Sequence, residues 1–445
     1  MALKKWLILL IVYSIPAMVA SGQGRKINFL EYSLPNGLKV ILHRDISVPV
    51  VAVTVLYHVG SKNEVPGRRG FAHFFEHLMF EGSVNIARGQ FMKYVTDAGG
   101  TLNANTSQDR TFYYEVLPSN QLALGLWLES ERMMHARIDS AGVNTQRKVV
   151  KEEKRMRFDN QPYGSVFAQV LKRAFHHTPY GYPPIGTMAD INKATLGEFI
   201  SFYKTYYVPN NAVLSIAGDI NLDSTKKMIS SWFGPIQAGK IPIIRPVVKP
   251  EPLTDAEKKA VIRDNIRLPA VIEAYRMPRE GSTDYYAARI LSVILSGGPS
   301  SRLNRELVDS TQQAAYVGTD PYFNENAGLL INIALANLGV SPDTLQKMMD
   351  GQVDSLKSSL VSKMEYTKVM NQIETAFVTG NSTMLGIAES LANYLVYFGN
   401  ANLINTELER YHQVTREKIR AVARKYLNAD NRVVLYYVPE NGLSH

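Results

Sequence analysis

The sequence predicts an α+β protein made of two duplicated units, each an antiparallel-rich sheet with helices packed on it. Three observations carry this prediction. The chain has 445 residues, which exceeds one ordinary hydrophobic core. Residues 236–255 are rich in proline, show little helical pattern, and divide the chain into two parts of similar length. Strand-like and helix-like segments recur in the same order in both parts, as expected for a repeated unit.

Each predicted unit opens with two strands and closes with a helix followed by a strand. Apolar β-branched residues favour the strands, and helical spacing of apolar residues precedes the closing strand. In the first unit we expect strands at 38–42, 50–57 and 211–216 and a closing helix at 195–206. The corresponding segments of the second unit are strands at 260–263, 270–275 and 432–438 and a closing helix at 415–426.

The start of the chain has the pattern of a secretory signal peptide. Lys4 and Lys5 precede an apolar run at 6–12, and small residues follow as far as Gly22. Because the apolar run is too short to span a membrane, we expect cleavage and export to the periplasm or beyond the cell. An uncleaved membrane anchor is the alternative. The expected division is therefore 1–22 signal peptide, 23–235 first unit, 236–255 linker and 256–445 second unit.

Composition limits the chemistry. The chain is 45% hydrophobic and 20% charged, which is ordinary for a globular protein and argues against disorder. It contains no cysteine, so a metal site can use only histidine and carboxylate ligands. The formal net charge is +9, but no dense run of Lys and Arg is present, and we expect no binding of nucleic acid.

The residues that carry chemistry lie in the run from His73 to His77, which has the order His-x-x-Glu-His. On a helix, residues four apart share a face, so both imidazoles can reach one metal ion. Glu76 can then reach a water molecule on that metal. Zinc hydrolases need this combination of imidazole ligands, an open position and a carboxylate that accepts a proton. Two ordinary hydrogen-bonded core histidines are the alternative.

A zinc site needs a third protein ligand, and Glu153 is the candidate. Read as a helix, residues 147–157 place Glu153 in an apolar stripe with Val149 and Met156, with Val150 beside them, whereas Glu152 shares its face with charged side chains. A carboxylate in an apolar stripe is costly unless it is paired or bound to a metal, which favours Glu153 over Glu152. An ion pair with a nearby Arg at the edge of the core is the alternative for Glu153.

With these residues, the chain resembles the pitrilysin family of inverzincin metallopeptidases, in the branch of mitochondrial processing peptidase and its bacterial relatives. That family has its third ligand, a Glu, about as far after the second His as Glu153 stands after His77. The resemblance runs from about residue 28 to near the C-terminus. Further matching segments are Gly70–Ala72, Phe80–Ser83, Gly99–Ser107, Pro179–Gly181 and Tyr206–Ala212.

The resemblance implies a zinc-dependent endopeptidase that hydrolyses short or unfolded peptides, with one Zn²⁺ per chain on His73, His77 and Glu153. Glu76 is then the general base on the zinc-bound water. It also implies units of the mitochondrial-processing-peptidase-like fold, one active and one inactive. Residues Leu102–Thr106 resemble the family's edge strand, which binds peptide by strand addition. The candidate substrate-binding residues are Asn103, Ala104, Asn105, Thr106 and Tyr316.

In that family four units close one chamber, so we expect a second chain as partner. The inactive unit of full enzymes carries an Arg and a Tyr that contact the substrate. Here Tyr316 occupies the Tyr position, but Asp309 stands where the Arg is expected. The partner is therefore either a related subunit that supplies the pair, which we favour, or a second copy of this chain. We expect Arg302 to make a structural pair near a helix start.

Two other functions compete with the peptidase. One is a non-catalytic core or scaffold subunit of a larger complex, although such relatives tend to lose the metal residues and this chain keeps them. The other is a zinc-bearing binding module in which Glu76 is dispensable. For Asn103, capping of a turn competes with a contact to substrate.

Overall fold

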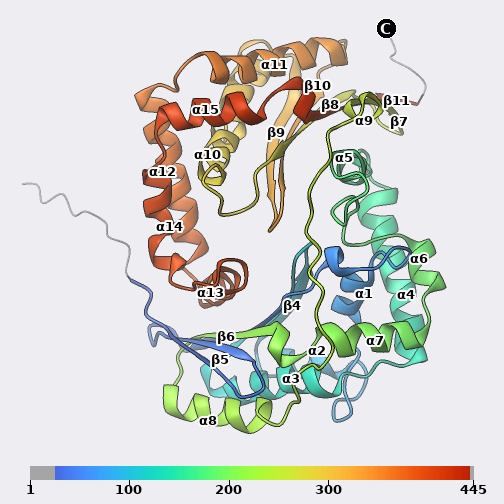
Figure 1. Ribbon diagram of the computed structural model, residues 1–445, viewed down its shortest axis with the longest axis vertical. Helices are drawn as coiled ribbons and strands as arrows, with labels where there is room; N and C mark the ends of the chain where they lie inside the picture. Colours follow the sequence, from blue (N-terminus) through green and yellow to red (C-terminus); the bar gives the residue numbers. More distant parts are fainter. Residues whose placement is uncertain (1–25, 441–445) are drawn as a thin grey trace, which may run out of the picture.

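The computed structural model describes residues 26–440, and the predicted signal peptide lies outside them. The chain forms two halves that face each other, each built on one sheet (Figure 1). Residues 234–254 run between the two halves and contain neither helix nor strand.

The first half carries the following elements: β1 (Leu30–Ser33), β2 (Lys39–Arg44), β3 (Val50–Tyr57), η1 (Ser61–Asn63), α1 (Phe71–Leu78), α2 (Gln90–Asp97), β4 (Thr101–Thr106), β5 (Thr111–Pro118), η2 (Ser119–Gln121), α3 (Leu122–His135), α4 (Ser140–Lys154), η3 (Arg155–Asp159), α5 (Val166–Ala174), α6 (Met188–Lys193), α7 (Leu196–Tyr206), η4 (Pro209–Asn211), β6 (Ala212–Gly218) and α8 (Leu222–Phe233).

The second half carries α9 (Asp255–Lys258), β7 (Lys259–Asp264), β8 (Ala270–Met277), α10 (Tyr285–Ser296), η5 (Asn304–Ser310), β9 (Ala314–Phe323), β10 (Gly328–Ala336), α11 (Pro342–Ser358), α12 (Lys363–Gly380), α13 (Met384–Phe398), α14 (Leu403–His412), α15 (Arg416–Tyr426), η6 (Ala429–Asn431) and β11 (Arg432–Pro439).

The strand order of the two sheets repeats. The first sheet runs β1-β2-β6-β3-β5-β4 and the second runs β7-β11-β8-β10-β9. In each sheet one corresponding pair is parallel, β2 with β6 and β7 with β11, and the other pairs are antiparallel. The predicted α+β architecture of two duplicated, antiparallel-rich units is confirmed.

The predicted opening and closing segments agree closely with the structure. The strand expected at 50–57 is β3, and the closing helices are α7 and α15, each beginning after a threonine cap. The Thr195 side chain accepts a hydrogen bond from the backbone amide of Glu198. The Glu198 carboxylate in turn accepts one from the backbone amide of Thr195, so α7 begins with a capping box. Thr415 caps α15 in the same way without the reciprocal bond.

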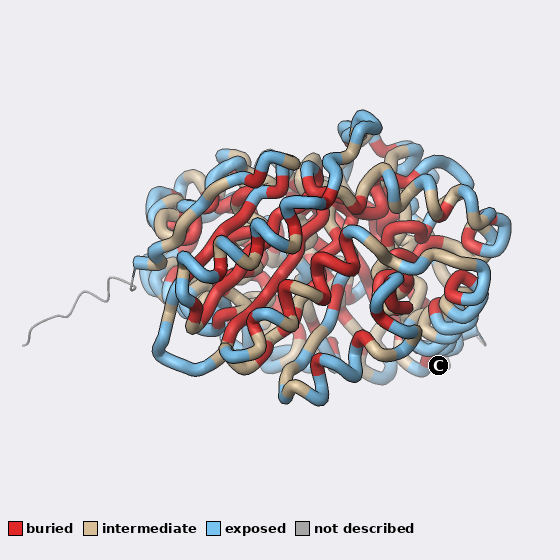
Figure 2. The backbone as a smooth tube through the Cα atoms, turned by 90° about the horizontal axis from the view of Figure 1, so that it is seen from below, coloured by how far each residue is buried: buried red, intermediate tan, exposed pale blue. Residues whose placement is uncertain are grey.

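Each sheet packs on helices of its own half through one face. In the first half, apolar side chains of this face form a core with α1, α3, α7 and α8. In the second half, the corresponding core includes α10, α11, α12 and α15. Figure 2 shows the result, with buried segments running through the interior and exposed segments around them.

The other face of each sheet is covered by a helix from the opposite half. Helix α13 of the second half packs on β2, β3 and β6, where Leu391 and Leu395 meet Leu56 in a separate core. Helix α5 of the first half packs on β8 and β11 through Leu171 and Ala174. Figure 1 shows α13 above the first sheet and α5 beneath the second. The two halves therefore exchange one helix each.

Candidate metal centre

Helix α1 carries the central motif and is oriented by its apolar side. Phe71, Phe74 and Phe75 are buried, and the rings of Phe71 and Phe74 stack on Phe199 of α7, with centroids 4.6 and 4.9 Å apart. The opposite side of the helix therefore carries the polar residues of the motif. The helix begins after Gly70, whose φ of 97° is a conformation that favours glycine.

The structure brings His73, His77 and Glu153 together. The Nε2 atom of His77 lies 3.1 Å from Oε2 of Glu153, and Nε2 of His73 lies 3.5 Å from the same oxygen. One potential ligand atom from each of the three residues can be chosen so that all lie within 4.8 Å of one another. All three side chains are largely buried. The two predicted histidines and the predicted carboxylate therefore converge from α1 and α4.

The stripe used to select Glu153 has different members from those expected. Val149 and Met156 are 42% and 64% exposed, so the predicted apolar stripe through them is wrong. Val150, which was expected beside the stripe, is buried together with Val143, and Glu153 lies one turn beyond Val150 on that side. The α-helical spacing holds only as far as Lys154. The π-helical turn η3 follows, so Met156 no longer falls on the buried side of α4.

The second oxygen of Glu153 has its own partner. Nη1 of Arg157 lies 2.9 Å from Oε1, so the ion pair considered as an alternative coexists with the contacts to both histidines. Glu152 is exposed and pairs with Arg155 at 2.9 Å, as its charged face predicts. Glu153 alone of these two carboxylates faces the histidines.

Burial and mutual contact set the protonation of the cluster. Burial, and then the neighbouring His77, lower the pKa of His73 to about 4, so its imidazole is neutral at physiological pH. The hydrogen bond from His77 holds the pKa of Glu153 below its usual range. A neutral imidazole and an ionised carboxylate are the forms that bind metal ions.

Glu76 is not one of the three converging side chains, but it lies close enough to interact electrostatically with His77 and Glu153. The Thr106 hydroxyl donates a 2.6 Å hydrogen bond to Oε2 of Glu76. Burial raises the pKa of Glu76 above its usual value, and this effect outweighs the stabilisation that Thr106 gives to the carboxylate. Thr106 is the last residue of β4, so the predicted general base is tied to the predicted substrate-binding strand.

Strand β4 lies at one edge of the first sheet, and among residues 26–440 it pairs with β5 only. Asn103 and Asn105 are exposed, and Ala104 between them is buried. The Asn103 side chain accepts from the Ala104 amide at 2.9 Å, and Asn103 lies within the strand rather than in a turn. The edge therefore has the position and form that strand addition requires.

The residues of the second half that the sequence analysis singled out lie in β9, in η5 and just before η5. Tyr316 is on the edge strand β9 with 55% of its surface exposed, and Asp309 is exposed in η5. Among the residues that the structure describes, neither belongs to the candidate metal cluster. Arg302 pairs with Glu365 in the first turn of α12 at 2.8 Å and donates to Ser355, which confirms its structural role.

Buried polar residues that the sequence analysis missed hold the C-terminal end of α1. Arg132 is buried, donates to the backbone oxygen of Met79 at 3.2 Å, and pairs with Glu115 and Glu129 at 3.1 and 3.0 Å. The hydroxyl of Tyr113 donates to a backbone oxygen within the helix. A cation at a helix C-terminus is electrostatically favourable. These partners are distant in sequence and carry no local pattern.

Two imidazoles and one carboxylate that converge, with a second carboxylate beside them, make the donor set of a zinc hydrolase. The chain matches the insulinase (peptidase M16) family over residues 39–188 and the peptidase M16 inactive domain over residues 193–373. It therefore belongs to the M16 peptidase family. The expected family and the two-unit fold are confirmed.

Similar proteins include zinc protease PqqE of Helicobacter pylori, 32% identical over 372 residues that cover 82% of each chain. A probable mitochondrial-processing peptidase subunit beta of Arabidopsis thaliana is 23% identical over 89% of this chain and 75% of its own. The crystal structure of a protease from Helicobacter pylori has a TM-score of 0.87 and 28% identity, covering 93% of this chain and all of its own.

A search of residues 26–440 for a long apolar helix that could cross a membrane finds none.

Proposed function

We propose that this chain is a zinc-dependent endopeptidase that hydrolyses short or unfolded peptides bound in an extended conformation. The observation that carries the proposal is the convergence of His73, His77 and Glu153, with Glu76 held beside them by Thr106 of the edge strand. Membership of a peptidase family and relatives named zinc proteases support the same reaction class.

The donor atoms suit zinc. His73 and His77 offer Nε2 atoms and Glu153 offers Oε2, which is a nitrogen and oxygen set that zinc accepts. We propose one Zn²⁺ per chain at these three residues. When bound, zinc would activate a water molecule and polarise the scissile carbonyl.

Glu76 is the proposed general base. Its carboxylate takes a proton from the attacking water and later donates that proton to the leaving amine. Because burial raises the pKa of Glu76, the carboxyl holds the proton more readily between these two steps. The bond from Thr106 keeps one carboxylate oxygen in place and leaves the other for the water.

The substrate is proposed to add to β4 as one more strand. Backbone hydrogen bonds along Asn103–Thr106 would hold an extended peptide, and this is independent of its sequence. A stable folded domain offers no such segment, which restricts the substrates to short or unfolded chains. Tyr316 remains a proposed contact that depends on a partner chain.

The proposed organisation is a metal-bearing domain at 23–235, a linker at 236–255 and an inactive domain at 256–445. We propose that a second related chain completes the active species, because the resemblance implies four units and Asp309 replaces the usual Arg. Export after cleavage of residues 1–22 is proposed from the sequence.

The test is Glu76→Gln in the full chain, with Glu152→Gln as the matched control. We expect Glu76→Gln to keep its zinc and to lose peptide hydrolysis by about a hundredfold or more, because the proton carrier is gone. Glu152→Gln should retain both. Elemental analysis and cleavage of an unstructured peptide measure the two properties. If Glu76→Gln hydrolyses peptide as fast as the wild type, Glu76 is not the general base and a zinc-bearing binding module is supported instead. If the wild-type chain shows no peptidase activity, alone or mixed with related chains, a scaffold subunit is supported.

A further inference from the structure

The short helix η1 lies between the two halves and is buried throughout. Its three residues Ser61, Lys62 and Asn63 are all buried, although Lys and Asn are usually found at the surface. It follows β3 and leads directly to the loop before α1. A buried charged side chain in such a position requires a specific partner.

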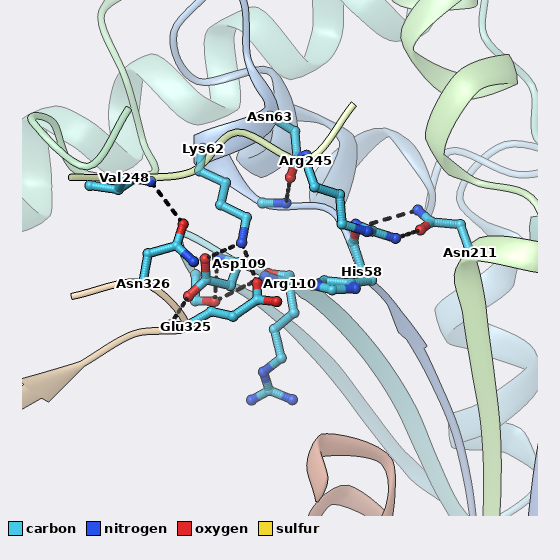
Figure 3. A network of polar contacts seen from close by, with 12 residues as sticks. His58, Lys62, Asn63, Asp109, Arg110, Asn211, Arg245, Val248, Glu325 and Asn326 are labelled. Atoms are coloured by element: carbon cyan, nitrogen blue, oxygen red, sulfur yellow. Dashed lines mark hydrogen bonds and ion pairs between the residues drawn. The ribbon is translucent and has the colours of Figure 1, made fainter. Parts of the chain in front are cut away.

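Lys62 finds its partners across the boundary between the halves. Its ammonium lies 2.8 Å from Asp109 and also pairs with Glu325, which belongs to the β9–β10 hairpin of the second half. Figure 3 shows the three side chains pointing toward one another. His58 lies 3.1 Å from Glu325, and the backbone amide of Glu325 donates to Asp109 at 2.9 Å. With only 1% of its side chain exposed, Lys62 depends on these carboxylates.

Glu325 is held in its charged form. Burial opposes the charge, but His58 and then Lys62 outweigh it and bring the pKa of Glu325 to about 2. The ion pair therefore persists across the whole physiological pH range.

The residue after η1 holds the beginning of the metal-bearing helix. Glu64 accepts hydrogen bonds from the backbone amides of Gly70 and Ala72, both at 2.8 Å. Gly70 occupies the N-cap position and has no side chain, so Glu64 satisfies amides that a Ser or Asp cap would normally serve. Burial raises the pKa of Glu64 to about 8, so at neutral pH this group acts on α1 through its hydrogen bonds rather than through a full negative charge. Ala72 directly precedes His73.

Backbone bonds tie η1 to the substrate strand as well. The amides of Ser61 and Lys62 donate to the backbone oxygens of Ser107 and Gln108, at 3.2 and 3.0 Å. These residues directly follow Thr106, which bonds to Glu76. Both structures that hold Glu76, the helix and the strand, are thus fastened to η1.

We propose that the second half of the chain positions the metal-bearing helix through η1, with Glu325 as the positioning residue, Lys62 as its partner and Glu64 as the contact to α1. The second half, whose residues up to Glu440 add no ligand to the candidate metal cluster, thereby contributes to the geometry of the metal centre. The consequence for catalysis rests on the proposed function, whereas the coupling between Glu325 and α1 does not.

The test is hydrogen–deuterium exchange of the α1 segment in the full chain carrying Glu325→Gln. The matched control is Glu389→Gln, which breaks another ion pair between the halves, from Arg110 at 2.6 Å; neither of its side chains forms a hydrogen bond or ion pair with η1 among residues 26–440. We expect exchange in α1 to rise by about tenfold in Glu325→Gln, as for the loss of one charge-assisted hydrogen bond, and to stay unchanged in Glu389→Gln. Glu64→Ala, which removes both acceptor oxygens, should accelerate exchange in the same segment.

Unchanged exchange in α1 of Glu325→Gln, or equal acceleration in both glutamine variants, would overturn the proposal. If exchange in Glu325→Gln rises throughout the chain, including α11, the variant has failed to fold. In that case Glu325→Asp, which keeps the charge on a shorter side chain, tests the proposal. Exchange should rise in α1 and stay unchanged in α11, and unchanged exchange in α1 would overturn the proposal. Zinc release to a chelator provides a second readout and should accelerate with α1 exchange. A wild-type chain that binds no zinc would refute the proposed function while the exchange comparison still decides the coupling.

Discussion

At the scale of single residues, the charge state of Glu153 depends on what surrounds each of its oxygens. One oxygen faces the two histidines and the other faces Arg157. Glu153→Gln replaces an anionic ligand by a neutral amide. We therefore expect zinc binding to weaken by about a hundredfold or to be lost, whereas Glu152→Gln should leave it intact. Elemental analysis after dialysis against a weak chelator measures this, and equal zinc loss in both variants would refute the assignment.

Thr106 allows the base to be tested without changing the base itself. Thr106→Val keeps the shape but removes the hydroxyl that orients Glu76. We expect kcat to fall by about tenfold, as for the loss of a hydrogen bond to a charged group, with a smaller change in KM. Thr106→Ser should restore kcat because it retains the donor. A fall in kcat that serine does not reverse would show that the methyl group, rather than the hydroxyl, matters.

The residues that lie close in sequence could be predicted and the distant ones could not. The spacing of His73, Glu76 and His77 follows from one helical turn, so their common direction is a local property. Glu153 was selected through a stripe that the structure does not contain, because Val149 and Met156 are exposed. Lys62 and Glu325 meet only through the packing of the two halves, and no periodicity in the sequence reports such a contact.

At the scale of elements, α1 is held at both ends by buried polar side chains from outside the helix. Glu64 serves the first amides, and Arg132 serves a backbone oxygen just beyond the last turn. Side chains from outside the helix thus replace the local caps that begin α7 and α15. Strands and closing helices with local signals were predicted within a few residues, whereas the polar contacts that orient α1 could not be predicted.

Substitution of Gly70 probes the close packing of the start of α1 against neighbouring backbone. A Cβ there would lie 2.8 Å from the backbone oxygen of Ile185, and φ is 97°. Gly89, the N-cap of α2, has φ 77° but no atom within 4 Å of an added Cβ. We expect Gly70→Ala to lower the free energy of unfolding by about 2–4 kcal/mol and Gly89→Ala by about 1 kcal/mol, because only the first adds a clash to the strain. Urea denaturation measures both, and equal losses would show that backbone conformation alone decides.

At the scale of the whole molecule, the second half must act with another chain if its substrate contact is incomplete. A carboxylate at position 309 cannot donate a hydrogen bond to a peptide or to a developing oxyanion. We expect this chain alone to be a weak peptidase and a related subunit with the Arg and Tyr pair to raise its rate by about a hundredfold or more. Asp309→Arg should recover part of that gain. Activity assays on mixtures, with mass by light scattering, measure it.

That expectation fails if a homodimer of the unmodified chain already cleaves peptides rapidly and neither a partner nor Asp309→Arg increases the rate.

The duplicated architecture itself was predictable because strands and helices recur in order. The exchange of α5 and α13 was not, since each helix is amphipathic in the ordinary way and nothing in its sequence identifies which sheet it covers.

The helix exchange also determines when the protein can finish folding. A ribosome makes β2, β3 and β6 early, but α13, which covers one apolar face of their sheet, is synthesised much later. Until then that face has no cover within the chain, and nascent strands with exposed apolar surface are prone to aggregate. The first half therefore cannot bury that face of its sheet until residues Met384–Phe398 are available.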